Sequence, residues 1–137
     1  MNISINQRYK GFYEHLGTDA AGRALFSSVQ SVEASALDAG INPELEVTAV
    51  NWSVDKNDQL SGKAIFHSVK THHQVSAVLT GTSPTPPKGQ NFRQAFVEVT
   101  FKGGTGNYRS AQGSAQVEAQ LYDDGSSEGV IKGQVTV

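Results

Sequence analysis

From residue 44 onward the chain alternates between apolar and polar positions, the pattern of β-strands with one buried face. Six such segments follow one another at similar spacing, separated by polar turns and by a proline-rich segment at 83–91. No helical pattern interrupts them, which predicts a mainly β fold: a small antiparallel, calycin-like β-barrel of six to eight strands. The positions expected on the buried face include Val50, Trp52, Val54, Ile65, His67, Val69, Val75, Ala77, Leu79, Ala95, Val97, Val99, Phe101, Ala115, Val117, Ala119, Leu121, Ile131, Val135 and Val137.

The N-terminal third has a different pattern. Residues 1–18 are mixed and predict no particular element. Between residues 19 and 39, apolar positions recur three or four residues apart, which predicts one helix. Thr18 or Asp19 is a suitable N-cap, and Gly40 stands where a helix would end. Four serines in this stretch keep a pair of serine-rich strands as the alternative.

Length and charge narrow the class of protein. The 137 residues fit one domain, residues 1–137, and show no linker and no repeat of fixed period. A net charge of −2 and a pI of about 6.0 argue against a nucleic-acid partner. There is no cysteine, and no stretch is long and apolar enough to predict a membrane span. Residues 1–8 lack a signal-peptide pattern, so we expect a cytoplasmic protein, or a secreted one if Met1 begins a trimmed chain.

The C-terminal part carries the most specific motif. Gly103-Gly104-Thr105-Gly106 ends one predicted strand, Tyr108 follows two positions later, and Gly113 opens the next strand. Residues 99–137 resemble the allene oxide cyclase and dirigent-like β-barrel superfamily in this pattern. The resemblance implies an eight-stranded barrel with a hydrophobic cavity, assembled as a dimer or trimer. It also implies either cyclisation of a lipophilic substrate or steering of phenol coupling as the activity of characterised members.

The motif itself is best interpreted as structural. Closely spaced glycines permit a tight corner with positive φ, and Tyr108 is expected to fold over the barrel end, where it would meet a ligand. A phosphate-binding loop would need a helix directly after the glycines, whereas residues 113–121 alternate like a strand.

Three polar or aromatic side chains interrupt the predicted buried face. Arg93, if it lies there, must sit at a barrel mouth or meet an anion, because an unpaired buried charge is costly. His67 is either a buried neutral histidine or the catalytic proton donor and acceptor of a pocket in which Trp52 forms a wall and Arg93 binds an anionic group. The spacing of the four histidines does not favour a metal site, and we expect no metal and no cofactor.

Three functions remain open at this point. The barrel is a cofactor-free cyclase or isomerase for a small lipophilic substrate, a non-catalytic binding module for a lipophilic or anionic apolar molecule, or a structural protein with a filled interior. The second face of the strands carries Val47, Phe66, Phe92 and Phe96, which would serve a homo-oligomer interface. Whether the protein is an enzyme is left undecided by the sequence.

Overall fold

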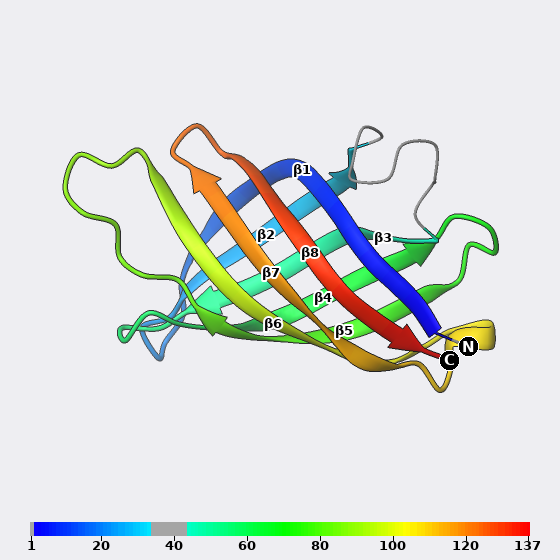
Figure 1. Cartoon of the computed structure of the whole chain (residues 1–137). Coiled ribbons are helices and arrows are strands. Elements are labelled where there is room, and N and C mark those ends of the chain that lie inside the picture. The colour runs from blue at the N-terminus through cyan, green and yellow to red at the C-terminus, as the bar shows by residue number, and fades with distance from the viewer. Residues whose placement is uncertain (1, 34–43) are drawn as a thin grey trace.

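Eight antiparallel strands form one closed barrel in the computed structural model, which describes residues 2–33 and 44–137 (Figure 1). Each strand pairs with the next along the chain, and β8 returns to pair with β1. The strands are β1 (Asn2–Thr18), β2 (Ala24–Val32), β3 (Leu45–Val54), β4 (Gln59–Ser68), β5 (Gln74–Thr82), β6 (Phe92–Gly104), β7 (Gln112–Tyr122) and β8 (Ser126–Thr136). A single 3₁₀ turn, η1 (Gly106–Tyr108), follows β6. The predicted small antiparallel β-barrel is therefore confirmed.

The barrel has two distinct ends. The turn end carries the connections at residues 19–23, 55–58, 83–91 and 123–125. The terminal end carries both chain ends, the turn at 69–73 and the segment 105–111, and it lies on the right in Figure 1. No helix within the described residues is long and apolar enough to cross a membrane.

Most of the predicted buried face points into the barrel. On β6 the buried side chains alternate from Ala95 to Phe101, and on β7 they alternate from Ala115 to Leu121. The two sets lie side by side on the inner face of the sheet, since Ala95 pairs with Ala119 on the neighbouring strand. The predicted inward positions on β5 are also buried. These strands place an unbroken apolar row on the inner face and mostly polar residues on the outer one, which is why their orientation was readable from the sequence.

The helix expected over residues 19–39 is wrong wherever the structure describes that range. Residues 19–22 form a turn and Ala24–Val32 is strand β2, while residues 34–39 lie outside the described residues. The reason is an inverted polarity: the side chains of β2 that face the interior include Ser28 and Gln30, whereas Val29 faces solvent with 73% of its surface exposed. Because polar residues point inward, the apolar and polar positions of β2 do not alternate as they do in the other strands. The apolar residues that remain are spaced three or four positions apart, as in a helix.

The orientation predicted for β4 and for the start of β3 is also wrong. On β4 the buried positions are Leu60, Ala64, Phe66 and Ser68, so Ile65 and His67 face outward. Apolar residues occur on both sides of this segment, Ile65 and Val69 on one side and Leu60, Ala64 and Phe66 on the other, and the prediction followed the first set. On β3 a bulge between Val47 and Ala49 shifts the alternation by one residue, which turns Val47 into the core. Val47 and Phe66 are thus unavailable for the predicted oligomer interface.

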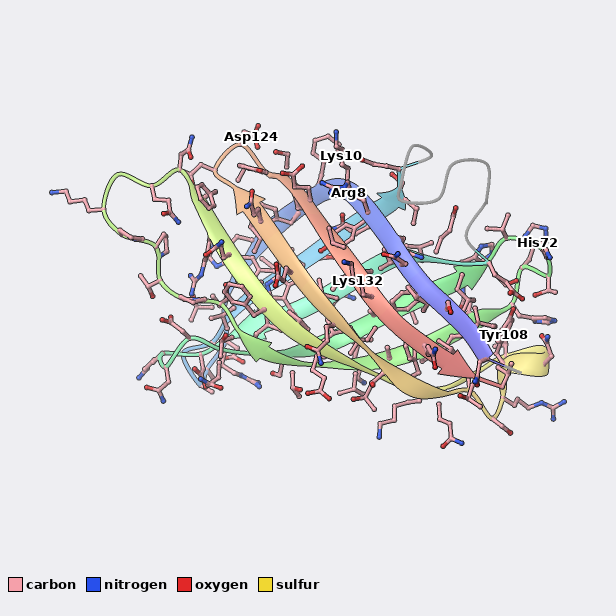
Figure 2. The ribbon with its side chains drawn as sticks, in the orientation of Figure 1. Arg8, Lys10, His72, Tyr108, Asp124 and Lys132 are labelled. Carbon is pink, nitrogen blue, oxygen red and sulfur yellow. The ribbon has the colours of Figure 1, made fainter. Side chains whose placement is uncertain are left out.

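The glycine motif after β6 forms a corner at the terminal end. Gly103 and Gly106 have φ of 81° and 58°, in the left-handed region that favours glycine. Thr105 anchors the corner to β5, because its backbone N–H donates to the Gln74 carbonyl and its hydroxyl accepts from the Gln74 N–H, both at 2.9 Å. Tyr108 is only 2% exposed and lies at this end of the barrel (Figure 2). Strand β7 follows, as predicted, so the corner lacks the helix that a phosphate loop requires.

A glutamine side chain joins two strands where the ladder between β2 and β3 ends. Strand β2 pairs with β3 only from Ala49 to Val54, so Leu45 and Val47 have no β2 partner within the described residues. The buried amide of Gln7 reaches them from β1. Its Nε2 donates to the Leu45 carbonyl at 2.7 Å, and its Oε1 accepts from the Val47 N–H at 3.2 Å. Gln7 thereby supplies the hydrogen bonds that a neighbouring strand would otherwise make.

We predict that Gln7→Met destabilises the barrel by about 2 kcal/mol or more, because it leaves a buried carbonyl and a buried N–H without partners. Denaturant unfolding monitored by circular dichroism measures the loss. The matched control is Gln116→Met, which changes an exposed glutamine on β7 and should alter stability by less than about 0.5 kcal/mol. Equal effects of the two substitutions would contradict the role given to Gln7.

Candidate functional site

Four rings gather at the turn end of the barrel. His15, Phe26 and Trp52 occupy one cross-strand row over β1, β2 and β3. The ring of His15 stacks on Phe26 with centroids 5.0 Å apart, and Phe26 stacks on Trp52 at 5.2 Å with the planes within 11° of each other. Tyr13 tilts against both Phe26 and Trp52. We call these four residues the aromatic cluster; it runs from the exposed His15 to the buried Trp52.

An internal cavity of about 60 Å³ lies in the barrel. It exists because several interior positions carry small side chains. Its walls are formed by Tyr9, Ser28, Gln30, Val47, Val50, Trp52, Leu60, Ala64, Phe66, Leu79, Ala95, Val97, Val99, Val117, Ala119, Leu121, Ser127 and Ile131. None of these described lining residues carries a charge. The cavity is less than half the size of the roughly 150 Å³ apolar cavity that is known to accept benzene, so its occupant must be small.

Two large side chains of the cavity wall depend on glycines in neighbouring strands. Tyr9 pairs with Gly129, and a Cβ on Gly129 would lie 2.5 Å from the Tyr9 hydroxyl. Gln30 lies across Gly11 of β1, where a Cβ would come within 2.2 Å of its Oε1, and so it reaches Ser127 on β8. A side chain on either glycine would thus displace a cavity-lining residue.

Most polar groups of the cavity wall are paired with one another. The Ser28 hydroxyl donates to the Val50 carbonyl at 3.0 Å, and the Gln30 amide bonds the Ser127 hydroxyl at 3.1 Å. Trp52 differs: it is 7% exposed, and its Nε1–H has no hydrogen-bond partner within the described part of the chain. Burial raises the pKa of the Tyr9 hydroxyl far above the ordinary value of a phenol. Tyr9 therefore stays protonated and neutral near pH 7.

Arg93 lies at the turn end, beside a second cavity of about 40 Å³ that Trp52 also lines. Its guanidinium donates to the carbonyl and hydroxyl of Ser83, and its Nη2 lies 3.2 Å from Oδ1 of Asp58. Asp58 accepts two further hydrogen bonds from Thr85, one from the backbone N–H and one from the hydroxyl. We call Asp58, Ser83, Thr85 and Arg93 the mouth latch, because they tie the proline-rich loop 83–91 to the turn between β3 and β4.

The structure brings together two of the four predicted site residues. Trp52 and Arg93 share the small cavity at the turn end, and Arg93 lies at a barrel mouth, one of the two positions expected for it. Tyr108 is buried at the terminal end and lines neither cavity. His67 faces outward on β4, where it pairs with Glu46 and Gln74 and its ring lies 5.6 Å from that of His72. The predicted pocket of Trp52, His67 and Arg93 is therefore wrong, because the orientation of β4 is reversed.

The sequence reasoning missed Tyr9, Tyr13 and Phe26. All three lie on β1 or β2, the strands that the pattern did not identify. A usable signal was present in β1, where Ile3, Ile5, Gln7 and Tyr9 alternate with polar residues. Within the described residues, no group of three or more histidine or acidic side chains is placed to hold a metal ion.

Comparison of the chain with protein-family models, with curated proteins and with solved structures found no match. The resemblance of residues 99–137 to the allene oxide cyclase and dirigent-like barrels therefore stays a prediction.

We predict that Asp58→Ala frees the loop 83–91, because it removes both hydrogen bonds from Thr85 and the ion pair with Arg93. The amide proton of Thr85 should exchange with solvent at least tenfold faster, as measured by NMR hydrogen exchange. Asp124→Ala is the control: it removes a similar turn-capping carboxylate at the same end, without contact to this loop, and should leave Thr85 unchanged. Protection of Thr85 that survives Asp58→Ala would contradict the mouth latch.

The latch should also depend on pH. The hydrogen bonds from Thr85 and the nearby Arg93 hold the pKa of the Asp58 carboxyl below its usual range. A lowered pKa means that the carboxylate stabilises the folded form above the ordinary aspartate value of about 3.9, and that this contribution is lost as the pH falls through the lowered pKa. The Thr85 amide should therefore stay protected at pH 5–7 and lose protection only in more acidic solution.

Proposed function

We propose that the barrel binds a small, uncharged, apolar molecule in its interior. The observation that carries the proposal is the cavity of about 60 Å³ in the barrel, whose wall is mainly aliphatic and includes Trp52. Binding sites for small molecules are concave, mainly apolar, and contain a few polar groups that orient the ligand. The interiors of eight-stranded barrels provide such sites in other proteins.

The charges favour a neutral ligand over the anionic one considered from the sequence. Among the described residues that line the two cavities, Arg93 is the one cationic side chain, and its guanidinium is already bound by Asp58 and Ser83. An anion in the cavity of 60 Å³ would be buried without a counter-charge among the lining residues, which costs several kcal/mol. A neutral molecule avoids this cost.

The geometry supports binding better than turnover. His67, the residue expected to transfer protons, faces outward on β4. The described cavity wall supplies no carboxylate, imidazole or amine, and the Tyr9 phenol is a poor base because burial keeps it protonated. A cyclase or isomerase acting through shape alone remains the narrower form of the same proposal.

Filling the cavity should abolish binding. Ala95→Leu adds three carbon atoms to the wall, on β6, and Ala95→Val is a milder form if leucine overpacks the barrel. We expect wild-type protein to show saturable NMR shifts of the methyl groups of Val97, Val99 and Val117 on titration with xenon, a small apolar probe that fits a cavity of this size. Both Ala95 variants should show none of these shifts.

The control for this experiment is Gln116→Leu, which adds apolar volume on the outer face of the neighbouring strand. It should leave the titration unchanged. Wild-type protein that does not respond to the probe would favour the alternative of a structural barrel with a filled interior.

We also propose that the barrel self-associates through the outer face of β1 and β2. Phe12 and Val29 lie opposite each other on these strands, and each has 73% of its surface exposed; Leu16, on β1, is 57% exposed. Exposed apolar residues that adjoin one another are typical of protein contact surfaces. A second copy of the chain would cover them in a symmetric dimer.

Sedimentation should therefore give a mass above that of the 14.6 kDa chain, and Phe12→Ser should shift the equilibrium toward monomer. Phe96→Ser, at an exposed phenylalanine on β6, tests whether any loss of surface phenylalanine has this effect and should not change the mass. A wild-type monomer at all concentrations would refute this interface.

A further inference from the structure

The hairpin between β4 and β5 carries three of the four histidines of the chain. His67 faces outward near the end of β4, and His72 lies in the turn at 69–73, at the terminal end of the barrel (Figure 2). The spacing of these residues along an extended strand did not favour a metal site. The folded turn brings the rings of His67 and His72 together, with their centroids 5.6 Å apart and their planes tilted by 38°.

Backbone hydrogen bonds to Ser68 hold this turn in shape. Ser68 is fully buried; its N–H donates to the His73 carbonyl at 2.8 Å, and its carbonyl accepts from the His72 N–H at 3.0 Å. The Ser68 hydroxyl also accepts from the Thr71 N–H at 3.3 Å. His72 completes the reversal with a φ of 61°, in the left-handed region that few residues other than glycine adopt. The approach of the two rings therefore follows from the backbone of the turn.

The separation of the two rings suits a single metal ion. An imidazole nitrogen binds Zn²⁺ at about 2.0–2.1 Å, so two rings that share an ion have their centroids roughly 4.5–6 Å apart. The observed 5.6 Å lies in this range. Neither imidazole makes a hydrogen bond within the part of the chain that the structure describes. His72 is exposed and His67 half-buried, so both rings can turn a nitrogen toward an ion without any movement of the backbone.

The other two histidines are engaged elsewhere. The Nδ1 of His73 lies 3.4 Å from the Thr105 hydroxyl, and its ring packs on Gly106, where a Cβ would come within 2.4 Å of Nε2. His15 stacks on Phe26 at the opposite end of the barrel. His15 and His73 thus provide matched controls for the pair.

The surroundings of the pair favour a cation. Glu46 of β3 lies directly opposite His67, and Lys70 is the one cationic side chain of the turn. Among the described residues no third histidine or acidic side chain is placed with the pair to hold an ion, which leaves the remaining coordination positions to water. Imidazole ligands select ions such as Zn²⁺, Ni²⁺ and Cu²⁺, whereas Mg²⁺ and Ca²⁺ prefer oxygen ligands.

We propose that His67 and His72 together bind one divalent transition-metal ion, such as Zn²⁺ or Cu²⁺, each through an imidazole nitrogen. Water molecules complete the coordination, so the ion keeps exchangeable positions. The site lies on the outside of the barrel and involves no residue of either cavity. It is therefore a second binding site, independent of the proposed binding of an apolar molecule.

Titration of the metal-free chain with Zn²⁺ tests the proposal. The imidazole C–H signals of the four histidines are followed by NMR, in a buffer that does not chelate metals and without an added histidine tag. The signals of His67 and His72 should shift together and saturate at one equivalent of Zn²⁺. The signals of His15 and His73 should stay in place, and Mg²⁺ should shift none of the four.

Substitutions supply the second measurement. His67→Gln and His72→Asn should each weaken Zn²⁺ binding roughly tenfold or more in calorimetric titration, because the remaining imidazole loses the advantage of a second ligand held beside it. Asparagine is tolerated in the left-handed region, so His72→Asn should keep the turn and the melting temperature. His73→Gln changes the neighbouring histidine and should alter the Zn²⁺ affinity by less than about twofold.

Three results would overturn this inference. Equal shifts at all four histidines would mean that Zn²⁺ binds to exposed imidazoles without selection. Unchanged Zn²⁺ affinity in His67→Gln or in His72→Asn would show that the two rings do not share an ion. Binding of Mg²⁺ with the same affinity as Zn²⁺ would assign the site to carboxylates such as Glu46. Each of these results would leave the proposed function untouched.

Discussion

Closure of the sheet by the pairing of β1 with β8 is the constraint on which the rest of the structure depends. A closed ladder leaves no edge strand, and every inward side chain then belongs to one enclosed interior. β1 makes this possible because its 17 residues pair with β8 in their first part and with β2 in their last part. The same strand contributes Gln7, Tyr9 and Tyr13 to the interior, so barrel closure and the candidate site share their residues.

The interior is filled by pairing large side chains with small ones across neighbouring strands. Tyr9 lies over Gly129, and the row continues through Ala119 to Ala95. Where alanine and serine positions adjoin without a large neighbour to cover them, space remains, and this is the origin of the cavity. The cavity is thus a consequence of side-chain size at positions fixed by the strand register.

Polar groups inside the barrel divide into two kinds. Gln7, Ser28, Gln30 and Ser127 are bonded to backbone or to each other, so they join strands and cost little to bury. In the mouth latch a charged group is paired in the same way, since the Asp58 carboxylate compensates the charge of the Arg93 guanidinium at the turn end. Trp52 belongs to the other kind, with a donor that the described protein does not satisfy.

The sequence by itself determined the fold class and the inward faces of β5, β6, β7 and β8, because these strands place their apolar rows on one side and mostly polar residues on the other. It also identified Trp52 as an interior residue and placed Arg93 at a barrel mouth or beside an anion. The orientation predicted for β4 was wrong, because the prediction followed Ile65 and Val69 instead of Leu60, Ala64 and Phe66, and it therefore placed His67 on the inner face. It missed β2, whose inward side chains include Ser28 and Gln30. Only the tertiary structure shows that these polar groups find partners on β3 and β8, that a bulge turns Val47 inward, and that the cross-strand register stacks Phe26 on Trp52. Alternation along a strand depends on local geometry, whereas partners and cavities depend on which strands become neighbours once the barrel closes.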